Sequence, residues 1–201
     1  MRKHLLLGTR NPGKLREITS ILDGSGWSFS SLQEFDHVRS AEENGVTYAE
    51  NAISKAQFYA CETGLIALAD DSGLEVAALD WAPGVYSARY AGGNASDADR
   101  RELLLAELSK TGNSDRRARF VAVVAIADPA GKVLNLSEGI CDGTITFAPR
   151  GTGGFGYDPL FIPDGHTQTF AELPEPIKNR ISHRALALVQ TKQFLAADSR
   201  G

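Results

Sequence analysis

The chain has 201 residues, and its 21 Lys and Arg side chains stand against 25 Asp and Glu, which gives a formal charge of −4 at pH 7. This balance argues against a general polyanion-binding surface, so we expect no nucleic acid polymer as a partner. Hydrophobic residues make up 42% of the chain and charged residues 23%, which excludes disordered and collagen-like proteins. We expect a single domain over residues 1–201 whose core needs no metal or disulfide for stability.

The cysteines and the N-terminal segment indicate the compartment. Cys61 and Cys141 lie far apart and show no metal-binding spacing, so a reducing cytoplasm fits better than secretion. The apolar run 5–7 ends at Gly8 and is too short for a signal peptide or a membrane span. We therefore expect a cytoplasmic protein with no membrane partner.

Hydrophobic periodicity and turn residues predict the elements of the first half of the chain. In order, these are a strand at 3–9, a helix at 13–22, a strand at 27–32, a polar connection at 34–45, a helix at 47–63 and a strand at 65–69 that ends in a polar turn at 70–73. Thr47 and Glu50 form a capping-box pattern where the second helix begins, and Gly64 supplies its stop.

The sequence of the second half of the chain predicts two strands that run antiparallel to each other. The expected elements are a structured loop at 81–93, a helix at 96–109, strands at 117–127 and 133–145, a glycine-rich loop at 151–158, a strand at 160–162 and an amphipathic helix at 179–197. The turn residues 128–131 join the two long strands into an antiparallel hairpin. The sequence therefore predicts a mixed sheet with helices, without repeats or linkers.

The segment G-T-R-N-P-G-K at 8–14 fits the phosphate-loop pattern G-x-x-x-x-G-K between a predicted strand and helix. Position 15 is Leu, where that motif needs Ser or Thr to hold a metal, so we do not expect a true Walker loop. A helix N-terminus together with Lys14 still favours an anion site. A tight turn with a surface lysine is the alternative.

The loop G-T-G-G-F-G-Y-D at 151–158 satisfies G-x-G-x-x-G, but Tyr157, Asp158 and Pro159 follow where a Rossmann helix should continue. We therefore do not expect a Rossmann fold. The glycines let the backbone approach a ligand closely, and Phe155 and Tyr157 are available to stack on a base. A flexible hairpin connection is the alternative.

Two adjacent carboxylates, Asp70 and Asp71, follow the predicted central strand. Neighbouring side chains on a strand point to opposite faces, so only one of them need face a site. With Glu42 or Glu43, that carboxylate would supply the one or two oxygen ligands that Mg²⁺ usually takes from a protein. A turn cap is the alternative reading of the Asp pair.

Three donors, Lys178, His183 and Arg184, fall across the start of the last predicted helix, with Ser182 among them. A cation near a helix N-terminus opposes the helix dipole, so a bound anion would explain Lys178 better than helix stability does. A solvated helix start is the alternative.

Seven blocks of the sequence, in the same order, resemble the inosine triphosphate pyrophosphatase family, which hydrolyses non-standard purine nucleoside triphosphates. The blocks are T-R-N-P-G-K at 9–14, S-A-E-E at 40–43, E-N-A-I-S-K-A at 50–56, A-D-D-S-G-L at 69–74, A-P-G-V-Y-S-A-R-Y at 82–90, G-T-G-G-F-G-Y-D-P at 151–159 and I-S-H-R at 181–184. The resemblance implies a mixed α/β fold with an elongated curved sheet, flanking helices and two lobes around a central cleft. It also implies a cytoplasmic homodimer.

The resemblance further implies roles for individual residues. It makes Asp71 the general base, and Glu42 and Asp71 the ligands of Mg²⁺. The implied substrate contacts are Thr9, Arg10, Asn11, Pro12, Gly13, Lys14, Ser72, Phe155, Gly156, Tyr157, Asp158, Lys178, His183 and Arg184. Arg10 stands where many relatives carry a small residue, so it either adds a phosphate contact or points to solvent. Pro174 and Pro176 stiffen the segment before Lys178.

The implied reaction is attack of water on the α-phosphorus of ITP, dITP or XTP, which releases a nucleoside monophosphate and pyrophosphate. Arg184 is a donor only, so it would pair with the carbonyl at position six of hypoxanthine or xanthine and disfavour adenine. The alternatives are a P-loop-like phosphotransferase, a related hydrolase with another base preference and a non-enzymatic nucleotide sensor. Leu15 argues against the phosphotransferase, which needs Ser or Thr at that position, and the carboxylates suited to a metal argue against a nucleotide sensor, which would not need them.

Overall fold

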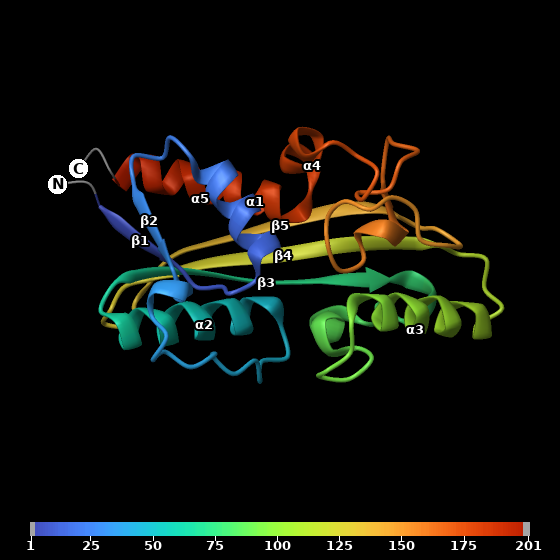
Figure 1. Ribbon diagram of the computed structural model, residues 1–201, viewed down its shortest axis with the longest axis horizontal. Coiled ribbons are helices and arrows are strands. Elements are labelled where there is room, and N and C mark those ends of the chain that lie inside the picture. Colours follow the sequence, from blue (N-terminus) through green and yellow to red (C-terminus); the bar gives the residue numbers. More distant parts are fainter. Residues whose placement is uncertain (1–2, 199–201) are drawn as a thin grey trace. The chain divides into compact units, whose positions relative to one another are not determined.

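A six-stranded sheet with the strand order β2-β1-β3-β4-β5-β6 organises the computed structural model, which describes residues 3–198 (Figure 1). β1 pairs in parallel with β2 and β3, whereas β5 and β6 are antiparallel. The elements are β1 (His4–Leu7), α1 (Pro12–Leu22), β2 (Ser28–Ser31), α2 (Tyr48–Thr63), β3 (Ile66–Val76), α3 (Asp97–Lys110), β4 (Arg117–Ala127), β5 (Val133–Ile145), β6 (Phe161–Pro163), α4 (Glu175–Ile181) and α5 (His183–Asp198). The predicted mixed α/β fold with flanking helices is confirmed.

The chain divides into two compact units. Unit 1 comprises residues up to Asp71, residues 122–139 and residues from His183 onward, and unit 2 comprises residues 72–121 and 140–182. The long strands β3, β4 and β5 therefore contribute residues to both units. Each unit has its own apolar core.

The core of unit 1 forms where α1 and α5 pack on the strands. Ile18 and Leu22 of α1, spaced four residues apart, are buried together with Leu188 of α5 and Leu68 of β3. The Trp27 indole is buried as well, and its Nε1 donates to the Leu195 carbonyl at 3.0 Å. The helical spacing predicted for α1 therefore corresponds to its buried face.

The core of unit 2 is rich in aromatic side chains. The Phe161 ring lies edge-on to Phe120, with 4.7 Å between centroids, and 5.2 Å from Phe170. Leu104 and Leu108, one turn apart on α3, complete this core. Aromatic pairs at these separations stabilise a core beyond the area that they bury.

Local end signals determine where α2 begins and ends. Thr47 Oγ1 accepts from the Glu50 N–H at 3.1 Å, and the Glu50 carboxylate accepts from the Thr47 N–H at 3.2 Å. Gly64 ends the helix in the left-handed conformation. This reciprocal capping box confirms the start and stop predicted from the sequence.

Two predicted elements were wrong. The strand predicted to end at 69 continues as β3 to Val76, so the predicted turn 70–73 is part of the strand. The predicted single helix 179–197 is two helices, because Ser182 has an extended backbone between α4 and α5. Lys178 therefore lies in the last turn of α4 and not at a helix start. No helix within residues 3–198 has the length and apolar character needed to span a membrane.

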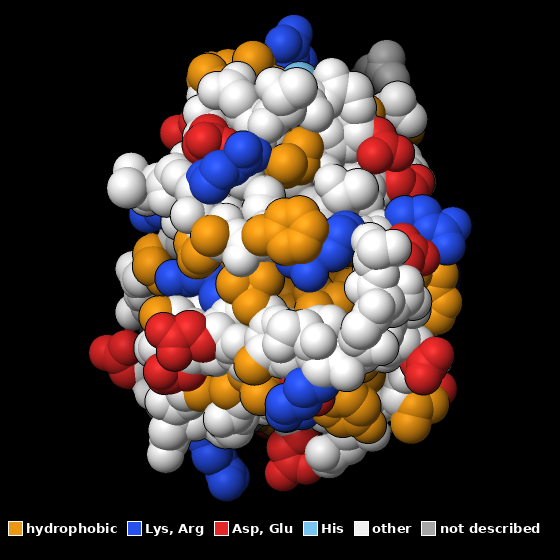
Figure 2. All heavy atoms as spheres, turned by 90° about the vertical axis from the view of Figure 1, so that its right-hand side faces the viewer, with side chains coloured by type: hydrophobic (Ala, Val, Ile, Leu, Met, Phe, Trp, Pro, Cys, Tyr) orange, Lys and Arg blue, Asp and Glu red, His pale blue; other side chains and the backbone are white. Residues whose placement is uncertain are grey.

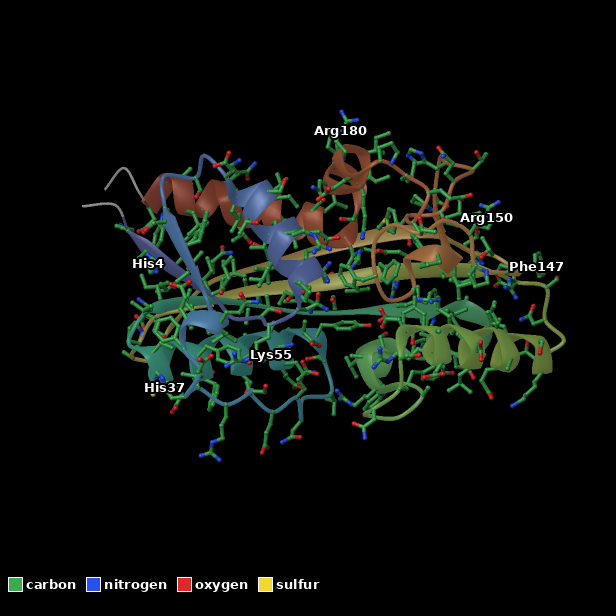
Figure 3. All side chains as sticks on the ribbon, in the orientation of Figure 1. His4, His37, Lys55, Phe147, Arg150 and Arg180 are labelled. Carbon is green, nitrogen blue, oxygen red and sulfur yellow. The ribbon has the colours of Figure 1, made fainter. Side chains whose placement is uncertain are left out.

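An exposed aromatic side chain stands out on unit 2. Phe147 is 85% exposed, and the Arg116 guanidinium lies 4.5 Å from its ring centroid. Figure 3 shows Phe147 and Arg150 at the same end of the unit, and Figure 2 shows hydrophobic and cationic side chains mixed on the face seen from that end. The cation–π contact accounts for the position of this ring.

Candidate active site

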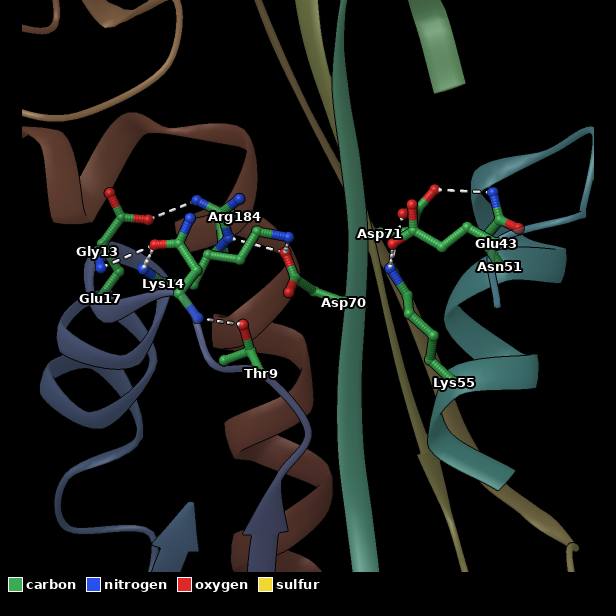
Figure 4. A network of polar contacts seen from close by, with 11 residues as sticks. Thr9, Gly13, Lys14, Glu17, Glu43, Asn51, Lys55, Asp70, Asp71 and Arg184 are labelled. Carbon is green, nitrogen blue, oxygen red and sulfur yellow. Dashed lines mark hydrogen bonds and ion pairs between the residues drawn. The ribbon is translucent and has the colours of Figure 1, made fainter. Parts of the chain in front are cut away.

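The two adjacent carboxylates of β3 point to opposite faces of the strand (Figure 4). Asp70 faces α1 and α5, and Asp71 faces α2. Both are buried, with 3% and 5% of the residue surface exposed. The alternation predicted for neighbouring strand residues is therefore present, and it separates two charge networks within unit 1.

Asp70 is the centre of the first network. Its Oδ2 contacts Lys14 Nζ at 2.9 Å and Arg184 Nε at 3.0 Å. Arg184 Nη1 in turn contacts Glu17 Oε2 at 2.5 Å. Burial alone would raise the pKa of Asp70, but Lys14 and Arg184 outweigh it and hold this pKa well below its usual range. Asp70 therefore stays ionised between two of the predicted substrate-binding cations.

The balance between burial and charge is reversed at Lys14. Burial is the largest influence on its pKa and lowers it, whereas the Asp70 carboxylate acts to raise it. Burial also acts to lower the pKa of Arg184, but Asp70 and Glu17 raise it above its usual value. Two donors of Arg184 are thus engaged by carboxylates, and the residue is 2% exposed.

The segment 9–14 forms the turn between β1 and α1. Asn11 caps α1, and its Oδ1 accepts from the N–H groups of Gly13 at 2.8 Å and Lys14 at 3.1 Å. Two N–H groups of the predicted anion site are therefore occupied by a side chain, so an anion would have to displace Asn11 to reach them.

The guanidinium of the exposed residue Arg10 bonds three backbone carbonyls. Its Nη1 donates to the Leu32 carbonyl and its Nη2 to the Val38 carbonyl, both at 2.9 Å, and Nη2 also donates to the Phe35 carbonyl at 3.3 Å. These bonds connect the phosphate-loop segment to residues 32–38. The guanidinium is thus explained without a phosphate, and a substrate contact of Arg10 stays a prediction.

Asp71 is the centre of the second network. Lys55 Nζ lies 2.7 Å from Asp71 Oδ1 and 2.7 Å from Glu43 Oε1, and Asn51 Nδ2 donates to Asp71 Oδ2 at 3.2 Å. Burial raises the pKa of Asp71, Lys55 opposes this effect, and Glu43 adds to it, which leaves the pKa above its usual value. Asp71 is therefore a buried carboxylate with an elevated proton affinity.

The predicted metal ligand Glu42 lies outside these contacts. Its side chain is exposed and Oε2 accepts from Asn44 Nδ2 at 2.8 Å, in a cavity of about 680 Å³ between residues 39–45 and α2. The neighbouring Glu43 is the glutamate that shares Lys55 with Asp71. Within residues 3–198 no group of three or more His, Cys, Asp and Glu side chains is placed to hold a metal ion.

The two networks together are close to electrically balanced. Three cationic side chains face four carboxylates, namely Lys14, Lys55 and Arg184 against Glu17, Glu43, Asp70 and Asp71. Such a set has no surplus positive charge for a strongly anionic ligand.

Unit 2 contains the glycine-rich loop. Asp158 Oδ2 accepts from the Phe155 N–H at 2.8 Å and contacts Lys178 Nζ at 2.6 Å, and both charged side chains are buried. Lys178 Nζ also lies 4.9 Å from the centroid of the Phe155 ring. A Cβ at Gly154, where φ is +69°, would overlap the Asp158 carboxylate. The loop conformation thus requires glycine at position 154.

The two aromatic side chains of this loop differ in availability. Tyr157 is 5% exposed within the core of unit 2, and its hydroxyl donates to the Ser87 carbonyl at 3.0 Å. The Tyr157 ring is therefore held inside the core of unit 2, and its contact with a base stays a prediction. Phe155 is only partly buried and remains the aromatic candidate for stacking.

Two other predicted contacts, Ser72 and His183, are chain neighbours of Asp71 and Arg184. Ser72 follows Asp71 on β3 and is partly buried, and His183 is the buried first residue of α5, next to Arg184. Most of the predicted site residues therefore lie in two sets: one in unit 1 around Asp70 and Asp71, and one in unit 2 around the glycine-rich loop, while Ser72 on β3 is the first residue of unit 2.

A sequence model of the Ham1 family matches residues 5–194. The chain belongs to the Ham1 family. A relative from Geobacter sulfurreducens named dITP/XTP pyrophosphatase is 51% identical over 191 residues, which span 95% of this chain and 96% of the relative. A relative of the same name from Thermus thermophilus is 50% identical over 184 residues, covering 92% and 87%. The structure of a HAM1 protein from Coxiella burnetii matches with a TM-score of 0.89 and 44% identity, covering 97% of this chain and 99% of that one.

The family resemblance predicted from the seven blocks is thus confirmed. Sequence reasoning nevertheless missed two polar residues of this Ham1 chain, Asn51 and Lys55, which contact Asp71. The signal was present in the block at 50–56, because these residues are four apart and share the buried face of α2 with Ala52 and Ala56. Buried polar positions on an otherwise apolar face indicate a site, since they need partners there.

Proposed function

We propose that this Ham1 family chain hydrolyses the non-standard purine nucleoside triphosphates ITP, dITP and XTP to the nucleoside monophosphate and pyrophosphate. The observation that carries the proposal is the pair of buried carboxylates on opposite faces of β3, one paired with Lys14 and the other with Lys55. Relatives with about half of their residues identical, over more than nine tenths of the chain, are named for this activity. The activity would clear deaminated purines from the nucleotide pool.

We propose Mg²⁺ as the metal, held by Glu42 and Asp71. The donor chemistry fits, because Mg²⁺ takes carboxylate oxygens as ligands; Asp71 Oδ1 pairs with the Lys55 ammonium at 2.7 Å, so the metal would compete with that ion pair. Glu43 shares the Lys55 ammonium with Asp71, whereas Glu42 accepts from the Asn44 amide, so we assign the metal to Glu42. When bound, the metal would neutralise phosphate charge and leave positions for water.

Asp71 is the proposed general base. A water oxygen attacks the α-phosphorus, the bond to the β-phosphate breaks, and the water proton passes to the Asp71 carboxylate. Asn51 and Lys55 each hold one oxygen of that carboxylate, which fixes its orientation. The upward shift of its pKa makes the ionised carboxylate a stronger base.

The remaining contacts follow from the two sets of residues. The segment Thr9–Lys14 and its neighbour Asp70 supply the phosphate side, where Lys14 brings a full charge. The partly buried Phe155 ring supplies a stacking surface for the base. The tightly bound Asp158–Lys178 pair keeps the loop of that ring in place.

Base selection and assembly complete the proposal. Arg184 is the proposed donor to the carbonyl at position six, which adenine lacks. We also propose a homodimer in the cytoplasm, as the family resemblance implies, and light scattering on the purified protein tests the dimer. The phosphotransferase and the nucleotide sensor are not favoured, since the relatives that match most of the chain are named as pyrophosphatases.

The Asp71→Asn variant tests the assignment of the general base. We expect loss of ITP hydrolysis by at least about a hundredfold, the scale of general-base catalysis, with the fold retained because Lys55 keeps its ion pair with Glu43 at 2.7 Å. Calorimetric ITP binding to the variant shows whether the site persists. An active Asp71→Asn variant contradicts the role of Asp71, whereas an inactive wild-type protein contradicts the proposed function.

A further inference from the structure

Two side chains of helix α3 bond both backbone polar groups of Gly156 in the glycine-rich loop. Asp97 Oδ2 accepts from the Gly156 N–H at 2.8 Å, and Arg101 Nη1 donates to the Gly156 carbonyl at 2.7 Å. All three residues belong to unit 2. The donor and the acceptor of this residue are therefore both fixed by side chains of a single helix.

The helix is suited to hold both groups. Asp97 and Arg101 are four residues apart, so they share one face of α3. The first turn is itself fixed by a capping box, in which Ser96 Oγ accepts from the Asp99 N–H at 3.2 Å and the Asp99 carboxylate accepts from the Ser96 N–H at 2.7 Å. The second oxygen of Asp97 contacts Arg100 at 2.7 Å. The Asp97 carboxylate is thus oriented by contacts within α3 as well as by its bond to the loop.

The loop needs such bonds at this position. Gly156 has φ of +60°, and a glycine backbone rotates between many conformations at little energetic difference. A Cβ at this position would meet no atom within 4 Å, so no neighbouring atom limits the residue on that side. Its neighbours on the C-terminal side are anchored through the Tyr157 hydroxyl and the Asp158 carboxylate. Without α3, the Phe155 end of the loop would lack a comparable tether at Gly156.

We propose that Asp97 and Arg101 are positioning residues that hold the nucleoside end of the site, by fixing the Gly156 backbone beside the Phe155 ring. The proposal rests on the proposed function, because that function makes this loop the nucleoside contact. Both residues act through the loop and do not touch the reacting atoms. Their loss should therefore weaken binding of the nucleoside part and leave the phosphate part unaffected.

Separate ligands for the two ends of the substrate test this. Affinities for IMP and for pyrophosphate with Mg²⁺ are measured by calorimetry on Asp97→Ala and Arg101→Ala, together with KM and kcat for ITP. We expect the Kd for IMP and the KM for ITP to rise about tenfold, the scale of one charge-assisted hydrogen bond. The pyrophosphate Kd and kcat should stay within about twofold, well below that scale.

Three variants serve as controls. Asp97→Asn and Arg101→Lys keep an acceptor and a donor, so they should recover most of the IMP affinity, which a merely structural defect would not allow. Glu102→Gln changes an exposed charge on the same helix and should bind both ligands normally. Melting curves identify any variant that fails to fold.

Three outcomes overturn the proposal. If the IMP affinity is unchanged in both alanine variants, Asp97 and Arg101 do not position the loop. If IMP and pyrophosphate bind equally more weakly, the substitutions affect the whole protein. If neither conservative variant recovers IMP affinity, the role of the two residues is merely structural. Failure of the proposed function has a different signature, because the wild-type protein would then not hydrolyse ITP.

Discussion

Replacement of Asp70 by Asn removes the charge at the centre of the first network. The carboxylate is 1% exposed and pairs with Lys14 at 2.9 Å and Arg184 at 3.0 Å. Removal of one partner of a buried ion pair costs about 3 to 5 kcal/mol of unfolding free energy. Burial already lowers the pKa of Lys14, so this lysine can lose its proton in the variant and relieve part of the penalty. We therefore expect a loss near 3 kcal/mol, or roughly 6 to 12 °C in Tm for a chain of this size.

The dependence of this loss on pH identifies its cause. The folded-state pKa of Asp70 is lowered from the unfolded value of 3.8. Its stabilising contribution is therefore complete above that value and is lost as the pH falls through the folded-state pKa. The part of the difference in unfolding free energy between wild type and Asp70→Asn that comes from the Asp70 charge should be complete at about pH 5 and shrink below about pH 4.

Urea unfolding across this pH range, in metal-free buffer, measures the difference directly. The exposed Asp36 provides the matched control, since Asp36→Asn should change the unfolding free energy by less than about 0.5 kcal/mol. A loss below about 1 kcal/mol for Asp70→Asn, within the range of an ordinary substitution, refutes the reasoning. A difference that persists undiminished at low pH would show that the lost stability does not come from the charge.

Two further predictions concern the metal and the loop. Glu42→Gln should raise the Mg²⁺ concentration for half-maximal ITP hydrolysis by about tenfold or more. Glu43→Gln should raise it less, because the Lys55 ammonium already pairs with that carboxylate. Titration of activity with Mg²⁺ measures both effects, and a larger effect of Glu43→Gln contradicts the ligand assignment. Gly154→Ala should lower both Tm and the rate of ITP hydrolysis because its Cβ would overlap Asp158, while Gly165→Ala has a similar positive φ in open space and should show only the backbone penalty of about 1 to 2 kcal/mol. Equal melting temperatures for these two alanine variants would contradict the overlap.

Much of the fold follows from signals that are local in the sequence. The capping box of Thr47 and Glu50 predicts where α2 begins, and the turn at 128–131 predicts the β4–β5 hairpin, because these features depend on residues close in the chain. The length of β3 could not be predicted in this way. Asp70 and Asp71 indicate a turn when read locally, and they remain in a strand because cations from α1, α2 and α5 neutralise them.

In the candidate site, too, local features could be predicted from the sequence and contacts between elements could not. Opposite orientations of Asp70 and Asp71 follow from strand geometry and were predictable from the sequence. The buried face of α2 indicated a site at Lys55, but its partner Asp71 could not be predicted, because that contact depends on how the helix packs beside the strand. The burial of Tyr157 could not be predicted either, because it depends on how the glycine-rich loop packs on the core of unit 2.

Product identification with labelled water tests the central claim most directly. Wild-type protein is incubated with Mg²⁺, H₂¹⁸O and, separately, ITP, dITP, XTP, GTP and ATP, and the phosphorus products are assigned by ³¹P NMR. The proposed function predicts monophosphate and pyrophosphate from the first three substrates, much faster than from GTP or ATP, with ¹⁸O in the monophosphate because water attacks the α-phosphorus. Orthophosphate as the first product, or equal rates with ATP and ITP, would contradict it.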